Sequence, residues 1–138
     1  MTNLYLEEQG EGQLEKEFGT RTNETHKYKR VSDLDMYQRV AKTTAIYPRE
    51  QAIIYPTLGL TGEAGEVANK VKKLIRDGYE NNKDYREALS KEIGDCLWYI
   101  SILADDIGFK LSDIANANLD KLLDRANRGK LSGSGDNR

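Results

Sequence analysis

The segment LGLTGEAGEVANKVKK, residues 58–73, and the segment KEIGDCLWYIS, residues 91–101, decide the fold. Both repeat apolar residues three and four positions apart, which is the period of one face of an α-helix. Each segment also carries two acidic residues three positions apart, namely Glu63 with Glu66 and Glu92 with Asp95. Residues at that spacing lie on adjoining turns of a helix, so both acids of a pair can reach one ligand.

Proline and glycine residues divide the rest of the chain into helical segments. Pro48 and Pro56 suit the first turn of a helix, because proline has a fixed φ and lacks an N–H donor. Gly78, Gly108 and Gly129 follow the ends of periodic stretches, and no stretch is convincing as a strand. The sequence therefore predicts an all-α fold with about four to five helices. The predicted helices span residues 33–44, 56–76, 83–107 and 111–127, with a further helix that begins at Pro48.

The composition is that of one polar globular domain. The 138 residues are 38% hydrophobic and 32% charged, with a net charge of −2, whereas a protein that binds nucleic-acid polymers usually shows a basic excess. No apolar run approaches the ~18 residues of a membrane span, and the amino-terminal stretch is unlike a signal peptide. We therefore expect a cytoplasmic protein whose partners include no nucleic-acid polymer and no membrane. Three segments are predicted: a polar arm at 1–31, the helical domain at 32–129, and a glycine-rich polar tail at 130–138.

The two central helices each carry an apolar stripe with acids along its flank. At about 100° per residue, one stripe runs from Leu60 to Ile75 and the other from Leu89 to Ile107. If the helices pack through these stripes, the two acid pairs come together. A single acid–lysine pair on a helix is usually a solvated face, but four carboxylates at a partly buried edge repel one another unless a cation lies between them. Mg²⁺ and Mn²⁺ prefer carboxylate oxygens and also bind phosphates, so the sequence predicts a site for either ion.

Basic side chains near such a site are candidate phosphate ligands. Lys70 and Lys73 continue the side of the first acid pair, one and two turns later. Asn118, Lys121 and Arg125 share one border of the last predicted helix. An ordinary helix border with extended basic side chains is the alternative. Beside a metal-binding cluster, an amide and two cations are better explained as phosphate ligands.

Trp98 lies opposite the apolar stripe of its helix, near Ile102. A helix that is apolar on two sides is buried on two sides. We interpret this second face as a subunit interface, with the aromatic wall of a pocket as the alternative. We therefore expect a homodimer or homotetramer, in which homo-oligomerisation completes the helical bundle.

Residues 58–73 and 91–101 together resemble the MazG-like nucleotide pyrophosphohydrolases, which belong to the all-α NTP pyrophosphatase superfamily. The ExxE and ExxD motifs of that family match Glu63-Ala64-Gly65-Glu66 and Glu92-Ile93-Gly94-Asp95, with 25 residues between them. The segment NLDKLLDRANRGKLSGSGDNR (118–138) is similar to the NxxKxxxR helix and tail of the family, except that Ser134 stands where an acid is more usual. The segment MYQRVAKTT (36–44) is similar to its first helix. As a short single-domain form with such a tail, the chain is similar to the family members that bacteriophages carry.

The resemblance implies an enzyme that hydrolyses a nucleoside triphosphate to the monophosphate and pyrophosphate, acting in the host cytoplasm if a phage encodes it. A metal-bound water would attack the α-phosphorus, and Glu63 or Glu66 would accept its proton as the catalytic base. The resemblance also implies dimers or tetramers. It assigns the divalent metal to Glu63, Glu66, Glu92 and Asp95. It assigns the phosphates to Lys70 or Lys73 together with Asn118, Lys121 and Arg125.

The nucleobase pocket is expected near Gln38, Tyr55 and Trp98. The Gln38 amide can both donate and accept hydrogen bonds, although a solvated position on the first helix is the alternative. Tyr55 or Trp98 offers a flat wall that suits a purine, and we expect dGTP to be preferred.

Two other functions stay open at this point. A non-catalytic oligomerisation or adaptor module explains the stripes and Trp98 but not the acid pairs, and a hydrolase of another phosphoanhydride would use the same carboxylates. A di-iron or di-manganese carboxylate bundle typically uses ExxH motifs. The one histidine of the sequence, His26, lies in the polar arm and not beside the acid pairs, so the sequence disfavours such a bundle.

Overall fold

The structure is a computed structural model that describes residues 33–78 and 83–132, and within these ranges it contains helices and no strand. The all-α prediction is confirmed. Among the described helices, none is both long enough and apolar enough to cross a membrane. The predicted arm at 1–31 and most of the predicted tail lie outside the described residues. The helices are α2 (Leu34–Lys42), the 3-10 helix η1 (Arg49–Gln51), α3 (Ile54–Asp77), α4 (Lys83–Asp106) and α5 (Leu111–Asn127).

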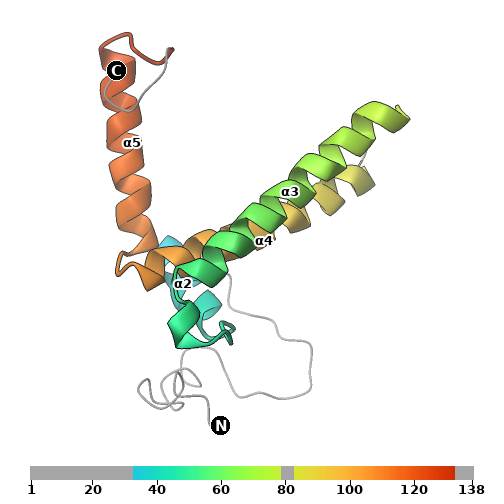
Figure 1. The fold of residues 1–138 in the computed structure, drawn as a ribbon. Coiled ribbons are helices and arrows are strands. Elements are labelled where there is room, and N and C mark those ends of the chain that lie inside the picture. Colours follow the sequence, from blue (N-terminus) through green and yellow to red (C-terminus); the bar gives the residue numbers. More distant parts are fainter. Residues whose placement is uncertain (1–32, 79–82, 133–138) are drawn as a thin grey trace.

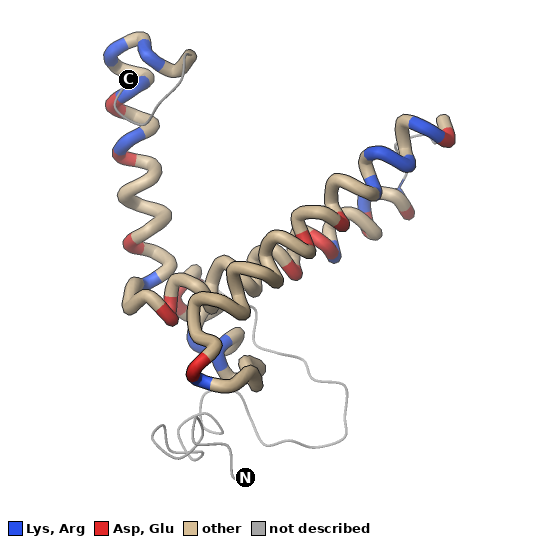
Figure 2. Tube along the Cα trace, viewed as in Figure 1, with Lys and Arg blue, Asp and Glu red and all other residues tan. Residues whose placement is uncertain are grey.

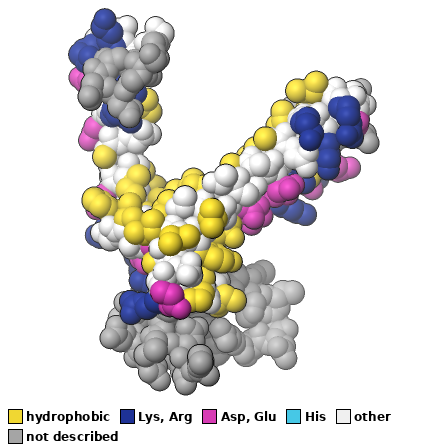
Figure 3. All heavy atoms as spheres, in the orientation of Figure 1, with side chains coloured by type: hydrophobic (Ala, Val, Ile, Leu, Met, Phe, Trp, Pro, Cys, Tyr) yellow, Lys and Arg dark blue, Asp and Glu magenta, His cyan; other side chains and the backbone are white. Residues whose placement is uncertain are grey.

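Helices α3 and α4 form a long antiparallel hairpin (Figure 1). Helix α2 packs against α4 near the open end of this hairpin, and α5 leaves the end of α4 at a steep angle and stands apart from α3 (Figure 1). Hydrophobic side chains gather where these helices diverge, whereas charged side chains lie farther out along the hairpin (Figure 3). The first nine residues of α3 carry no charge, as Figure 2 shows along the chain.

The helices begin and end at residues that suit helix termini. The Asp33 carboxylate accepts a hydrogen bond from the backbone N–H of Met36 at 2.6 Å, which caps the start of α2. Pro56 lies in the first turn of α3, where a missing N–H is tolerated. Gly78 ends α3 with a φ of +64°, a left-handed conformation that glycine adopts without steric cost. Helix α5 has the predicted bounds, and α3 and α4 differ from the prediction by one or two residues at their ends.

The buried core lies where α2 crosses the C-terminal half of α4. Ile102 is only 2% exposed, and Trp98 packs against the same cluster. The expectation that Ile102 contacts a second subunit is therefore wrong, because the same chain buries this side chain. Trp98 is only half-buried, so a subunit interface at this residue stays a prediction. The cluster consists of Ala41, Ala45, Tyr47 and Ile102, with Tyr37 and Trp98 packed around it.

The apolar stripe that we expected inside the hairpin is partly uncovered. Ile93, Leu97 and Ile100 of α4 are 54%, 36% and 40% exposed. The half-buried residues are instead Glu92 and Cys96, each of which immediately precedes an exposed residue of the stripe. One residue corresponds to a rotation of about 100° round the helix. The seam between α3 and α4 is therefore rotated toward the acidic flank, and much of the stripe faces outward.

Candidate metal centre

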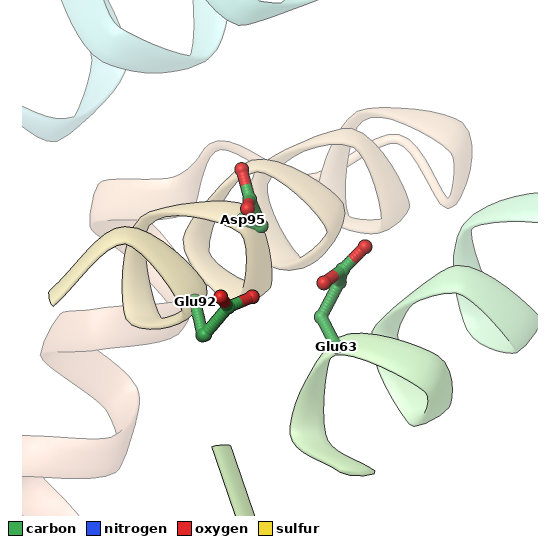
Figure 4. A group of neighbouring side chains, drawn as sticks. All are labelled: Glu63, Glu92 and Asp95. Carbon is green, nitrogen blue, oxygen red and sulfur yellow. The ribbon is translucent and has the colours of Figure 1, made fainter. Parts of the chain in front are cut away.

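Three of the four predicted metal ligands come together in the α3–α4 seam. Glu63 extends from α3, and Glu92 and Asp95 extend from adjoining turns of α4 (Figure 4). One carboxylate oxygen from each residue lies within 4.8 Å of the other two. Glu63 and Glu92 are half-buried, whereas Asp95 is exposed. The cluster is thus open to solvent on one side, as a site that admits a ligand has to be.

The fourth predicted ligand, Glu66, does not belong to this group. It lies one turn beyond Glu63 on α3, and its side chain is exposed. Its role as a metal ligand therefore stays a prediction. The difference arises from helical phase, since Glu63 lies in the seam and Glu66 lies about 60° away from it.

Close packing of an aromatic ring against α3 shapes the wall next to the cluster. A Cβ atom on Gly59 would lie 2.1 Å from the ring of Tyr99, so only glycine permits the observed approach. Gly59 is one helical turn before Glu63, and Tyr99 is one turn after Asp95. This contact therefore fixes the Tyr99 ring beside the carboxylates.

The pKa values of two tyrosine hydroxyls near the cluster are raised. Burial raises the pKa of Tyr99, the neighbouring hydroxyl of Tyr55 raises this pKa further, and the charges of Glu63 and Asp95 add smaller contributions in the same direction. Burial also raises the pKa of Tyr37 on α2, with a contribution from Asp95. A neighbouring carboxylate disfavours the charged phenolate, so both phenols stay neutral hydrogen-bonding groups at physiological pH.

An aromatic row leads from the α2–α3 connection to the cluster. The ring of Tyr55 stacks on Tyr47, with centroids 4.8 Å apart, and lies 6.4 Å from Tyr99. Trp98 meets Tyr99 edge to face at 4.8 Å. The structure thus brings Tyr55 and Trp98, two residues of the predicted base pocket, close to the ring of Tyr99. The indole N–H of Trp98 already donates to Thr44 Oγ1 at 2.8 Å.

The third residue of the predicted base pocket, Gln38, is engaged inside the chain. It is buried, and its Nε2 donates to the carbonyl oxygens of Ser101 at 3.2 Å and Phe109 at 3.0 Å. Its Oε1 accepts a hydrogen bond from the N–H of Leu111 at 2.9 Å. Both amide protons are therefore used to join α2 to the α4–α5 connection. That Gln38 contacts a base stays a prediction, and the structure gives this side chain a different role.

The predicted phosphate ligands are spread over two regions. Lys70 belongs to the cluster, since its Nζ lies 3.1 Å from Glu92 Oε1, while Lys73 is exposed farther along α3. Asn118 and Lys121 line an open groove of about 940 Å³ between α4 and α5, together with Leu97. Leu97 is two residues after Asp95 and hence about 200° round α4. The groove therefore lies on the far side of α4 from the carboxylates of its own chain. Arg125, one turn beyond Lys121, is buried.

The sequence analysis missed Gly59 and Tyr99 as residues of the site. Tyr99 follows Glu92 by seven residues, which is two turns on the same helix face, so its place could have been inferred from spacing. Tyr37 reaches Asp95 only because α2 crosses α4, and no local pattern reports such a crossing.

Comparison with known proteins gives two matches. Residues 54–129 match the MazG nucleotide pyrophosphohydrolase domain. The Gene 37 protein of Mycobacterium phage L5 is 45% identical to this chain over 112 residues, which cover 76% of this chain and 98% of that protein. No solved structure matches. The matched domain includes α3, α4 and α5, and so contains all three clustered carboxylates.

Proposed function

The chain belongs to the MazG nucleotide pyrophosphohydrolase family, and from that premise we propose that it hydrolyses nucleoside or deoxynucleoside triphosphates to the monophosphate and pyrophosphate. The observation that carries the proposal is the meeting of Glu63, Glu92 and Asp95 within 4.8 Å across the hairpin seam. Such a group of like charges disfavours the folded state unless a ligand offsets the repulsion. The hydrolysis takes place, in this proposal, in the cytoplasm of the host of a phage.

The donor set fits a hard divalent cation. Three carboxylates on two helices offer only oxygen atoms, which are the ligands that Mg²⁺ and Mn²⁺ prefer. We propose Glu63, Glu92 and Asp95 as the residues that hold the ion, with Glu66, one turn farther along α3, as a further carboxylate. When bound, the cation would supply charge neutralisation at the phosphates and a more acidic water. The remaining tasks fall to side chains of the protein.

Glu66 is our candidate for the proton acceptor. It lies one turn from Glu63 and outside the group of three carboxylates. A carboxylate that does not ligate the metal keeps its lone pairs for a proton from the attacking water. Glu63 is the other candidate for this base. Pyrophosphate, the leaving group, carries negative charge that a cation can neutralise. We assign this role to Lys70 and Lys73.

A second copy of the chain supplies the remaining phosphate ligands in this proposal. Asn118 and Lys121 line the α4–α5 groove, which lies on the far side of α4 from the carboxylates. The exposed apolar side chains of Leu97 and Ile100 border the same region, and surface of this kind is normally covered by a partner. A homodimer or homotetramer can therefore bury the stripe and bring α5 of one copy to the carboxylates of another.

Subunit mixing tests this sharing directly. The Asp95→Asn variant lacks a carboxylate, and the Lys121→Ala variant lacks an α5 cation. If the two residues act across the interface, mixed oligomers contain sites in which both are intact, so mixing two inactive proteins restores turnover. No recovery after verified subunit exchange would contradict the sharing, as would a monomeric mass of the wild-type protein by light scattering.

For the base we propose the aromatic row and a purine, with dGTP the preferred substrate. Tyr55 is 46% exposed and stacked on Tyr47, so a base can add to a row that is already formed. Trp98 meets the ring of Tyr99 edge to face and extends this row. Because the Gln38 amide protons are both engaged, we expect hydrogen bonds to the base from other groups.

The decisive experiment offers all eight canonical ribo- and deoxynucleoside triphosphates with Mg²⁺ or Mn²⁺ and separates the products. We expect pyrophosphate and the monophosphate, the highest kcat/KM for dGTP, and no turnover in EDTA. Orthophosphate as the primary product, or activity that survives EDTA, would contradict the proposed reaction. Equal efficiency on all deoxynucleotides, or a pyrimidine preference, would contradict only the substrate.

A further inference from the structure

Lys70 forms an ion pair inside the acidic cluster. Its Nζ lies 3.1 Å from Oε1 of Glu92, and the two side chains are only 29% and 19% exposed. By comparison, Lys83 and Glu87 on the surface of α4 are 82% and 61% exposed. The Lys70–Glu92 pair is therefore shielded from water well beyond an ordinary surface pair, and its electrostatic interaction is correspondingly stronger.

The position of Lys70 follows from the helical repeat. Lys70 is seven residues after Glu63, so it lies two turns farther along α3 on the same face. Helix α4 runs antiparallel to α3, and Glu92 precedes Asp95 by one turn. Lys70 therefore reaches the cluster from the end at which Glu92 lies, while Asp95 and Glu63 occupy the other end.

The charges in this seam do not balance when the protein is free of metal. Glu63, Glu92 and Asp95 contribute three negative charges within 4.8 Å, and Lys70 contributes one positive charge. Like charges at such distances disfavour the folded state, and the ammonium group offsets part of that repulsion. A divalent cation would bind the same carboxylate of Glu92 and would be repelled by an ammonium group held 3.1 Å from its Oε1.

From this geometry we propose that Lys70 is a tethered counter-ion that competes with the divalent cation for Glu92. The inference rests on the proposed metal site and deepens it. In the metal-free protein Lys70 neutralises part of the cluster and keeps the hairpin seam closed. Cation binding releases the ammonium group from Glu92 and leaves it free to approach a phosphate. Lys70 thus lowers the affinity of the site for the metal in the absence of substrate. Its ammonium group becomes available to a phosphate only when the metal occupies the site.

An alternative role for Lys70 predicts the opposite sign. If Lys70 only orients Glu92 as a ligand, its removal leaves Glu92 poorly positioned and weakens metal binding. If Lys70 competes with the cation, its removal strengthens binding. Metal affinity without substrate therefore separates the two roles, independently of turnover.

The test is Mn²⁺ affinity, measured by calorimetry and by electron paramagnetic resonance, for wild type, Lys70→Met and Lys72→Met. Lys72 is an exposed lysine of α3 about 200° round the helix from Lys70, so its replacement changes the net charge equally without touching the cluster. We expect Lys70→Met to bind Mn²⁺ about tenfold more tightly, the factor that corresponds to an ion pair of moderate strength. The Lys72→Met variant should bind within about twofold of wild type, because exposed charges are screened by salt.

Thermal melts give a second readout. Without metal, Lys70→Met should melt below wild type, and saturating Mn²⁺ should raise its melting temperature more than it raises that of wild type. If Lys70→Met does not fold, Lys70→Gln serves in the same two measurements, since it removes the charge and keeps a polar side chain. Unchanged or weaker Mn²⁺ binding in these variants would overturn the counter-ion role.

Wild type and Asp95→Asn distinguish this failure from failure of the metal site. If wild type binds Mn²⁺, Asp95→Asn does not, and Lys70→Met binds no better than wild type, only the role of Lys70 is wrong. If wild type itself binds no Mn²⁺, the metal site and the counter-ion role are both wrong.

Discussion

Polar side chains are hydrogen-bonded where α4 meets α2, whereas carboxylates of like charge lie close together where α4 meets α3. Where α4 ends against α2, the buried amide of Gln38 makes three hydrogen bonds to backbone groups of Ser101, Phe109 and Leu111. Where α4 meets α3, carboxylates of like charge converge within 4.8 Å with a single lysine ion pair. Satisfied polar groups hold a fold together, whereas converging like charges stabilise a fold only when a ligand joins them. The contrast separates a structural region of this chain from the region in which we propose the metal site.

The largest effect should follow a change in the carboxylate seam. Replacing Asp95 by Asn removes one of the proposed metal ligands and should lower turnover at least about a thousandfold, since charge stabilisation of the transition state would be lost. The melting temperature of the metal-free variant should equal or exceed that of wild type, because one repelling charge is gone. Pyrophosphate release and circular dichroism measure the two effects. Glu50→Gln, an equal charge change on η1, is the control and should leave both unchanged. A variant of Asp95 that unfolds would assign the acids to structure.

The opposite result is expected at the α2–α4 junction. Gln38→Ala removes three hydrogen bonds and strands two carbonyl oxygens and an N–H, so the free energy of unfolding should fall by about 2–4 kcal/mol. Urea denaturation at a fixed protein concentration measures the loss. Gln51→Ala, at an exposed glutamine of η1, should cost under about 0.5 kcal/mol. A fully stable Gln38→Ala variant with altered base selectivity would instead support base recognition by Gln38.

Two glycines of α3 sharpen the comparison within one helix. Gly59→Ala places a Cβ within 2.1 Å of the Tyr99 ring, so we expect a loss of about 1–3 kcal/mol from overpacking. Gly62→Ala meets no atom within 4 Å and should add about 0.5–1 kcal/mol through helix propensity. Thermal melts of the two variants should therefore shift in opposite directions. Shifts of equal sign would mean that Tyr99 does not pack against α3.

The smallest effect concerns acid stability at the start of α5. Asp35 Oδ1 accepts a hydrogen bond from the N–H of Ser112 at 3.0 Å, and hydrogen bonds from Ser112 lower the pKa of Asp35 below its usual 3.8. A lowered pKa stabilises the folded state above about pH 4, and this contribution disappears as the pH falls through the folded pKa. Melting temperatures of wild type and Asp35→Asn should therefore differ at pH 6 and converge below pH 4. A difference that is independent of pH would show that the charge of Asp35 contributes nothing.

The helix ends could be predicted because local chemistry determines them. Gly78 and Gly108 have φ of +64° and +81° and mark the ends of α3 and α4. The meeting of Glu63, Glu92 and Asp95 in space could also be predicted, since spacings of three and four residues fix the helix face on which a side chain lies, and their role as metal ligands stays a prediction. Glu66 shows the limit of that argument, because spacing gives a face and not the rotation of the helix against its neighbour.

The covered face of α4 could not be predicted for the same reason. Its helix has apolar residues on two sides, and periodicity does not say which side α2 will cover. Ile102 lies in the core of the chain and the half-buried Trp98 packs against it, whereas Ile93 and Leu97 are left exposed. Gln38 escaped prediction because its three partners are 63 to 73 residues away in the sequence. Such partners are known only once α2 and α4 are placed together.

The most direct test of the account follows the oxygen atom of the attacking water. With Mg²⁺ in ¹⁸O-labelled water, wild type should convert a nucleoside triphosphate into labelled monophosphate and unlabelled pyrophosphate, as read by ³¹P NMR or mass spectrometry. That result requires water attack at the α-phosphorus. If Glu63, Glu92 and Asp95 hold the site, the Asp95→Asn variant should give no labelled product. Label in pyrophosphate or in orthophosphate would contradict the account.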